Sequence, residues 1–256
     1  MIGSIGIDLG SRRTKMVLFH GDRIEKRHVT GSWTFDREEI KGKVGEFDAG
    51  VGFPIGTTGY GRQEGATVFH GTAVTEIRAF AHGVRKLLPA VRTIVDVGGQ
   101  DSKTIHLDER GRVTGFEMND KCAAGTGKFF EMLAGTLRVG FDELPRLALG
   151  AGKAFPVSST CAVFAESEII GHLHDGVDPA MIARGVFRSV AERLHAMLRR
   201  SGFSSPAVLV GGGANACLAA ELASLLGSEF TLPEEGIWFG AVGAAVLAQS
   251  SKGESK

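Results

Sequence analysis

Residues 93–103 read TIVDVGGQDSK, an apolar run that ends in an aspartate and a glycine turn. Two further strand-like runs follow, at residues 104–107 and 113–118, with a turn between them. The same order of strand, aspartate, glycine turn, strand, turn and strand occurs at residues 2–29. We interpret the repeat as an internal duplication that builds two lobes, each offering one glycine turn to a shared cleft. The alternative is a coincidence between glycine-rich hairpins.

Both turns have the composition that phosphate binding requires. Successive backbone N–H groups in a glycine turn can wrap a phosphate, and a carboxylate beside it can hold Mg²⁺ through water. The predicted catalytic carboxylates are Asp8, Asp96 and Asp101. The predicted phosphate contacts are Gly10, Ser11, Arg13, Thr14 and Lys15 in the first turn, and Gly98, Gly99 and Gln100 in the second. An aspartate before a glycine turn is weak evidence alone, so this prediction depends on the repeat.

The rest of the chain alternates apolar segments with turns. A strand at residues 207–210 runs into Gly211, Gly212 and Gly213 before a helix, which lets the backbone approach a nucleotide closely. Residues 50–61 predict a strand that ends in a glycine-rich turn. The predicted helices span residues 73–88, 126–138, 142–150, 166–174, 179–200, 215–226 and 236–248. We expect a first lobe over residues 1–90, completed by the C-terminal helix at 236–249, and a second lobe over residues 91–235.

Two of the three cysteines lie among small and polar residues close to predicted helices. Cys122 follows Asn119 and Asp120, either of which can cap the helix that comes next. Cys161 lies in a similar setting, within VSSTCAVFAE. The N–H groups and the dipole at a helix start stabilise a thiolate, which favours a nucleophile or a metal ligand. The alternative for both is a buried structural thiol, the role we assign to Cys217.

Charge and composition exclude several classes of function. The chain has 29 basic and 29 acidic side chains, so no overall charge favours nucleic acid or an anionic membrane. Three cysteines without a CxxC spacing argue against a disulfide scaffold or a zinc ribbon. No apolar run reaches about 18 residues, and no signal peptide precedes the first strand pattern. We therefore expect a cytoplasmic protein with no membrane and no nucleic-acid partner.

The glycine segments, taken in order, resemble those of the actin/hexokinase/Hsp70 ATPase superfamily. Asp8–Gly10 matches its first phosphate segment, Asp96–Gly99 its second and Gly211–Gly213 its adenosine segment. This resemblance implies a duplicated two-lobe α/β fold of the ribonuclease H-like kind. Longer motifs are more specific, namely TGYGR at 58–62, DVGGQDSK at 96–103, NDKCAAGTG at 119–127 and SSTCAVFAESE at 158–168. They resemble the BadF/BadG/BcrA/BcrD-type ATPases, which include the activator (component A) of 2-hydroxyacyl-CoA dehydratases and the ATPase subunits of benzoyl-CoA reductase.

The resemblance implies an ATPase that binds ATP or ADP with Mg²⁺ and passes one electron to a dehydratase or reductase partner. It implies a homodimer that shares one 4Fe-4S cluster, with Cys122 and Cys161 of each subunit as ligands. A ferredoxin or flavodoxin is the expected upstream donor. The resemblance adds three nucleotide contacts, which are Gly125, Thr126 and Gly127. One departure is Ala214-Asn215-Ala216, where the family usually carries an Arg-Asn pair in the adenosine segment.

The residues support the shared cluster independently. A 4Fe-4S cluster generally needs four cysteine thiolates, and one chain offers two in suitable settings. Two chains about a two-fold axis offer four, if the axis passes through the cluster. Two other functions stay open from the sequence: a sugar-type kinase of the same superfamily, with Asp96 or Asp101 as its catalytic carboxylate, and a dimer held by zinc. Paired cysteines have no role in such a kinase.

Overall fold

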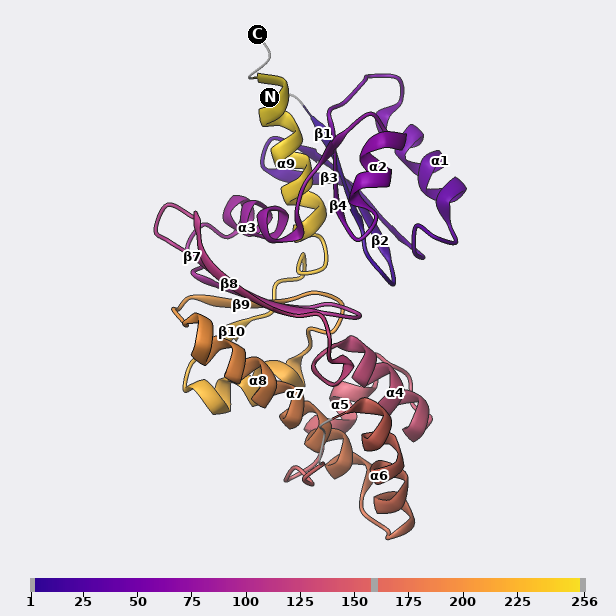
Figure 1. The fold of residues 1–256 in the computed structure, drawn as a ribbon, viewed down its shortest axis with the longest axis vertical. Coiled ribbons are helices and arrows are strands. Elements are labelled where there is room, and N and C mark those ends of the chain that lie inside the picture. The colour runs from indigo at the N-terminus through magenta and orange to yellow at the C-terminus, as the bar shows by residue number, and fades with distance from the viewer. Residues whose placement is uncertain (1–2, 158–160, 254–256) are drawn as a thin grey trace. The chain divides into compact units, whose positions relative to one another are not determined.

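The computed structural model describes residues 3–157 and 161–253, and the chain divides into two compact units (Figure 1). Unit 1 comprises Met1–Val91, Leu107–Val113 and Ile237–Lys256. Unit 2 comprises Arg92–His106 and Thr114–Gly236. Each unit is built around a five-stranded sheet that mixes parallel and antiparallel pairs.

The sheet of unit 1 has the strand order β3-β2-β1-β4-β5. Its central strand β1 (Ser4–Leu9) pairs antiparallel with β2 (Thr14–His20) and parallel with β4 (Ile55–Gly59). The edge strands are β3 (Arg23–Thr30) and β5 (Thr72–Ala73). Every residue of β1 is buried, because helices cover both faces of the sheet at this strand.

The two faces of this sheet are covered in different ways. On one face, α1 (Arg37–Asp48) adds its apolar stripe to a core with alternate residues of β1 and β2. On the other face, α9 (Phe239–Gly253) lies with its backbone directly on the strands, because a Cβ on Gly6 would overlap the carbonyl oxygen of Ala241. α3 (Glu76–Leu87) packs equally closely along α9. The predicted small-residue helix near the C-terminus therefore packs on unit 1.

The sheet of unit 2 has the strand order β10-β9-β6-β7-β8. Its central strand β6 (Thr93–Val97) pairs antiparallel with β7 (Ser102–Leu107) and parallel with β9 (Ala207–Val210). The edge strands are β8 (Val113–Asn119) and β10 (Phe230–Thr231). The second repeat of strand, turn and strand is thus the centre of unit 2, as the first is the centre of unit 1.

Helices of unit 2 form one continuous apolar core with β6 and β9. They are a 3-10 turn η1 (Ala123–Gly125), α4 (Gly127–Leu137), α5 (Leu144–Leu149), α6 (Ala162–His174), α7 (Pro179–Ser201) and α8 (Ala216–Leu226). The long helix α7 supplies the largest share of buried side chains, along the stripe predicted from its periodicity. Among the helices of the described residues, none is long and apolar enough to cross a membrane.

The repeated hairpins predicted from the sequence are present in both units. In each, the aspartate on the first strand lies directly opposite a lysine on the second: Asp8 opposite Lys15, and Asp96 opposite Lys103. We name the β1–β2 pair the first hairpin and the β6–β7 pair the second hairpin. Their matching register shows that the repeat extends to the pairing of individual side chains.

One helix was not predicted, and one predicted helix begins earlier than expected. The strand and glycine-rich turn predicted over residues 50–61 are present as β4 and a turn at residues 60–61, and the helix that was not predicted, α2 (Arg62–Val68), follows them despite the low helix propensity of Gly65. A Cβ on Gly65 would overlap the side chain of Leu9, so close packing on β1 requires glycine at this position. Helix α6 begins at Ala162, four residues before the predicted start at Glu166.

Candidate functional site

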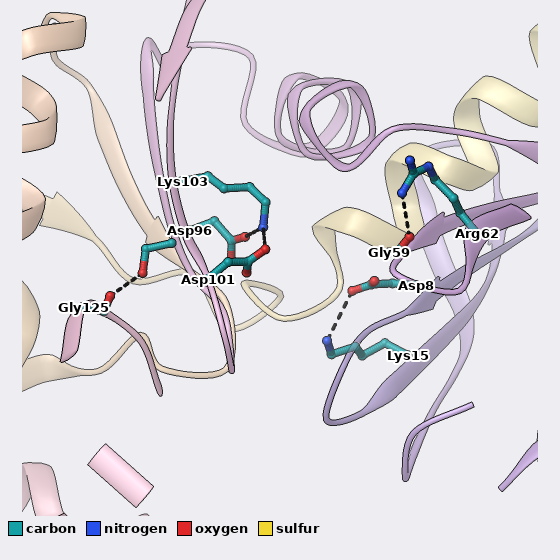
Figure 2. Close-up of polar contacts among 9 residues, drawn as sticks. Asp8, Lys15, Gly59, Arg62, Asp96, Asp101, Lys103 and Gly125 are labelled. Carbon is teal, nitrogen blue, oxygen red and sulfur yellow. Dashed lines mark hydrogen bonds and ion pairs between the residues drawn. The ribbon is translucent and has the colours of Figure 1, made fainter. Parts of the chain in front are cut away.

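The first hairpin holds a part-buried carboxylate–ammonium pair (Figure 2). Asp8 is only 6% exposed, and its Oδ2 lies 3.2 Å from Lys15 Nζ. Backbone crowds the carboxylate, since a Cβ on Gly59 would lie 2.8 Å from Oδ1 and one on Gly240 would lie 3.2 Å from Oδ2. Gly59 also has a φ of +87°, which favours glycine. The ends of β1, β2 and β4 therefore fix Asp8 in place with one cation beside it.

Two buried hydroxyls in unit 1 flank this pair. Thr14 precedes Lys15 in β2, and Thr58 lies opposite Asp8 in the β1–β4 register. Within the described part of the chain, neither hydroxyl has a hydrogen-bond partner. Buried polar groups are nearly always hydrogen-bonded, so this hairpin has hydrogen-bonding capacity left for a ligand. Of the other predicted contacts in its turn, Ser11 is half-buried and Arg13 is exposed.

The second hairpin holds a buried triad (Figure 2). Lys103 Nζ lies 2.8 Å from Asp101 Oδ2 and 3.4 Å from Asp96 Oδ2, and Lys103 is 2% exposed. Two carboxylates share one ammonium, so the triad carries one net negative charge, whereas the pair in the first hairpin is neutral. An anionic group of carboxylate oxygens is a suitable environment for a hard cation such as Mg²⁺.

The start of α4 is hydrogen-bonded directly to the turn of the second hairpin. The N–H groups of Gly127 and Lys128 donate to the carbonyl oxygens of Gly98 and Gly99, both at 2.9 Å. These are two of the N–H groups that a helix leaves without partners at its start. The Ser102 hydroxyl adds a third link by donating to the Gly125 carbonyl at 2.5 Å. The turn and the start of α4 are therefore held together.

The predicted nucleotide contacts at Gly125, Thr126 and Gly127 are buried beside this turn, and their own N–H groups all donate within the protein. Thr126 caps α4 by accepting a hydrogen bond from the Lys128 N–H at 3.3 Å. The capping role predicted for Asn119 or Asp120 is therefore wrong. The sequence did not distinguish these candidates, because all three are residue types favoured at helix starts.

The glycines after β9 also meet the second hairpin. The N–H of Gly213 donates to the Val97 carbonyl at 2.9 Å. A Cβ on Gly211, whose φ is +93°, would overlap the carboxylate of Asp96. Unit 2 thus brings together three of the predicted nucleotide segments: the turn at 98–101, residues 125–127 and residues 211–213.

Cys122 lies on the segment that joins β8 to α4 and is half-buried. The side chain of Asn119 fixes the backbone at this cysteine, since Oδ1 accepts from the Cys122 N–H at 3.1 Å and Nδ2 donates to the Cys122 carbonyl at 3.0 Å. A 3-10 turn follows Cys122, and α4 begins five residues later. Cys122 is therefore near the helix start and not at it.

Cys161 occupies the N-cap position of α6 and is also half-buried. The predicted dipole effect of a helix start thus applies more directly to Cys161 than to Cys122. The hydroxyl residues Ser158, Ser159 and Thr160 of the same motif lie outside the described residues. Val163 and Phe164 follow Cys161 and are 71% and 75% exposed, which is unusual for large apolar side chains.

Cys217 is fully buried in unit 2. Burial, together with the nearby charge of Glu221, raises the pKa of its thiol to about 12. The thiol therefore stays protonated at neutral pH, and a protonated buried thiol is a poor metal ligand. Residues 3–157 and 161–253 contain no group of three or more His, Cys, Asp or Glu side chains arranged to hold a metal ion. The two accessible thiols of one chain thus fit a cluster only as part of a larger ligand set.

Three residues of this arrangement were not among the predicted site residues: Lys103, Ser102 and Thr58. Lys103 had a detectable signal, because superposing the two hairpin repeats aligns it with Lys15. Thr58 is part of the TGYGR motif, in which Arg62 Nη1 also donates to the Gly59 carbonyl at 3.2 Å. Ser102 gave no signal, because its partner is 23 residues away in the sequence.

The comparisons with known proteins agree on one family. The profile of the BadF/BadG/BcrA/BcrD ATPase family matches residues 5–248. The chain is 38% identical over 256 residues to the activator of lactoyl-CoA dehydratase from Anaerotignum propionicum, with 96% of each sequence covered. It is 34% identical to the activator of the 2-hydroxyisocaproyl-CoA dehydratase from Clostridium difficile, solved with bound ADPNP, at a TM-score of 0.88 with 100% and 98% of the two chains covered.

A more distant structure shares the fold alone. A ROK family glucokinase from Streptomyces griseus has a TM-score of 0.57 at 15% identity, with 97% of this chain and 99% of that chain covered. The predicted fold class, a duplicated two-lobe α/β ATPase fold of the actin/hexokinase kind, is therefore confirmed.

Proposed function

Because the chain belongs to the BadF/BadG/BcrA/BcrD ATPase family, we propose that it is an ATP-dependent activator that donates one electron to a CoA-thioester dehydratase or reductase. Relatives that activate lactoyl-CoA and 2-hydroxyisocaproyl-CoA dehydratases support this class of partner. The observation that carries the proposal is the bonding of the second hairpin to the segment that follows Cys122. A nucleotide-binding turn and a candidate cluster ligand are thereby parts of one hydrogen-bonded unit.

Both hairpins take part in the proposed binding of Mg-ATP. In unit 1, Asp8 can hold Mg²⁺ through water and the glycine turn after it can bind phosphate. In unit 2, Asp96 and the glycine turn after it have the same roles, and Asp101 is the further catalytic carboxylate. The unpartnered Thr14 and Thr58 hydroxyls support a polar ligand at the first hairpin. The net negative triad supports a cation at the second. Residues 125–127 support nucleotide binding through their hydrogen bonds to the second hairpin. Gly211–Gly213 contact the adenosine part of the nucleotide.

Two copies of the chain are proposed to share one 4Fe-4S cluster. Cys122 and Cys161 are half-exposed while Cys217 is buried and protonated, so each copy supplies two thiolates of the four required. When bound, the cluster supplies a one-electron redox centre between a ferredoxin or flavodoxin donor and the partner enzyme. Val163 and Phe164 beside Cys161 are exposed apolar side chains, which supports a protein–protein contact next to the cluster.

Purification without oxygen, followed by iron, sulfide and ATPase measurements, tests the proposal. We expect a brown, oxygen-labile protein with about two iron atoms per chain, half of a four-iron cluster. Cys122→Ser and Cys161→Ser should each abolish the chromophore, whereas Cys217→Ser, the matched control, should retain it. Asp8→Asn should slow ATP turnover while the chromophore stays, because it alters the first hairpin only.

Three results would contradict parts of this proposal. About four iron atoms per chain would exclude a shared cluster. A colourless protein that phosphorylates a sugar would indicate the kinase. A colourless dimer that contains zinc would indicate a structural metal site.

A further inference from the structure

A buried serine joins the second hairpin to the segment that carries Cys122. Ser102 is the first residue of β7, directly after the turn, and it is fully buried. Its hydroxyl donates to the Gly125 carbonyl, and the Gly125 N–H donates in turn to the Cys122 carbonyl at 3.2 Å. Two hydrogen bonds therefore connect the end of the turn with the backbone of Cys122.

The Cys122 end of this connection is held tightly. The Cys122 carbonyl accepts from both the Gly125 N–H and Asn119 Nδ2. Asn119 also lies against Gly125, where an added Cβ would come within 2.7 Å of Nδ2. These contacts leave no free space between Gly125 and Cys122. A displacement of Gly125 is therefore passed on to the Cys122 backbone.

Among the described residues, backbone hydrogen bonds and this serine link the turn to the segment that follows Cys122. The bonds from Gly127 and Lys128 to the Gly98 and Gly99 carbonyls place α4 but act beyond Gly125, on the far side from the cysteine. Of these contacts between hairpin and segment, the Ser102 bond is the one made by a side chain. It is also the one that reaches the 3-10 turn between Cys122 and α4.

We infer that Ser102 is a positioning residue which transmits the nucleotide state of the turn at 98–101 to Cys122 by way of Gly125, with Asn119 holding the cysteine end. The inference rests on the proposed function, because the turn must hold phosphate for its state to change. When phosphate contacts move the turn, Ser102 moves with it as the next residue along the chain. The Gly125 carbonyl follows, and the environment of the Cys122 thiol changes.

Ser102→Ala tests this inference, with Thr104→Val as the matched control. Thr104 is two residues along the same strand and equally buried, but its hydroxyl pairs with Ser201 of α7 at 3.0 Å. The full-length chain is treated with a chelator so that the thiols are free. The alkylation rate of each cysteine is then measured by peptide mass spectrometry without nucleotide, with Mg-ADP and with Mg-ADPNP. Fully buried Cys217 reports any unfolding.

In the wild type, exchanging Mg-ADP for Mg-ADPNP should change the Cys122 alkylation rate about fivefold or more. In Ser102→Ala that change should fall below about twofold, while nucleotide affinity stays within about threefold. Thr104→Val should respond as the wild type does. Asn119→Ala, which removes both hydrogen bonds from Asn119 to the Cys122 backbone, should make Cys122 react fast with either nucleotide, while Cys217 stays unreactive if the chain remains folded.

Contrary outcomes separate the inference from the proposed function. A full nucleotide response in Ser102→Ala, or its loss in Thr104→Val as well, overturns the role of Ser102. A wild type that binds both nucleotides without any response at Cys122 also overturns it, while the nucleotide site stands. A wild type that binds neither nucleotide overturns the proposed function together with the inference.

Discussion

At the scale of residues, Lys103 is the most constrained charge in the two hairpins. Lysine is rarely buried unless it is paired, and here the ammonium lies between the carboxylates of Asp96 and Asp101. Removing one member of a buried group of charges leaves the remaining charges uncompensated. The resulting loss in the free energy of unfolding is much larger than the net stability that the intact group contributes. The triad is therefore sensitive to loss of its one cation.

Replacing this cation should destabilise unit 2. We expect Lys103→Met to lower the free energy of unfolding by about 3–5 kcal/mol at neutral pH, because two buried carboxylates then lose the ammonium that lies between them. Lys15→Met is the matched control in the first hairpin. Lys15→Met should lower the free energy of unfolding by less than Lys103→Met does, because the Lys15 side chain is 18% exposed and one carboxylate, not two, loses this ammonium. Urea unfolding followed by circular dichroism measures both, and equal losses would show that the extra carboxylate is unimportant.

Cys161 and Cys122 lie in different backbone settings. Cys161 occupies the N-cap position of α6 without a side-chain cap hydrogen bond, whereas Asn119 holds the backbone of Cys122 ahead of a 3-10 turn. Both residues are half-buried, which distinguishes them from the buried Cys217.

At the scale of elements, the packing of α9 on the sheet of unit 1 depends on glycine. Gly6 in β1 and Gly56 in β4 have no side chain, so the backbone of α9 rests on the strands. Such close approach brings α9 against β1, the strand that carries Asp8. It also places Gly240 beside the Asp8 carboxylate. A substitution that separates α9 from these strands should therefore lower the free energy of unfolding and also disturb the position of Asp8 in the first hairpin.

Adding one methyl group at this contact should be costly. We expect Gly6→Ala to lower the free energy of unfolding by about 2–3 kcal/mol, because its Cβ would overlap the Ala241 carbonyl and push α9 away. Gly42→Ala is the matched control, since Gly42 lies in the exposed middle of α1 with open space around it. It should raise stability by about 0.5–1 kcal/mol through better helix propensity. Thermal unfolding measures both, and a neutral Gly6→Ala would contradict the close packing.

At the scale of the whole molecule, the proposed sharing of a cluster requires an interface between copies beside Cys161. Val163 and Phe164 are exposed there, in the first turn of α6. Large apolar side chains at the centre of an interface often supply much of its binding free energy. In an isologous interface each copy contributes its own Val163 and Phe164, so these two residues contribute twice to the free energy of dimerisation.

A charge at this surface should therefore weaken the dimer. We expect Phe164→Asp to raise the dimer dissociation constant by about tenfold or more, because a carboxylate would be buried at the interface. Phe35→Asp is the matched control: Phe35 is 86% exposed but lies in unit 1, away from the cysteine segments in the chain. Sedimentation velocity over a concentration range measures both. A dimer that is insensitive to Phe164→Asp would place the interface elsewhere.

The sequence by itself determined the elements whose signals are local. Apolar runs that end in an aspartate and glycines predicted the central hairpin of each unit, and helical periodicity predicted α3, α7 and α8. Two half-exposed cysteines were distinguishable from Cys217 by their polar, small-residue surroundings. These predictions succeeded because turn chemistry and periodicity act over a few neighbouring residues.

Only the tertiary structure decided how distant residues combine. The Ser102–Gly125 bond, the contact of Gly6 with α9 and the helical state of α2 all depend on partners that the local sequence does not reveal. Thr126 caps α4 because the second hairpin fixes where that helix starts, although asparagine has a higher intrinsic preference for the N-cap position than threonine. Propensity differences of this kind are small compared with the free energy of packing and of satisfying buried polar groups, so the fold determines the outcome.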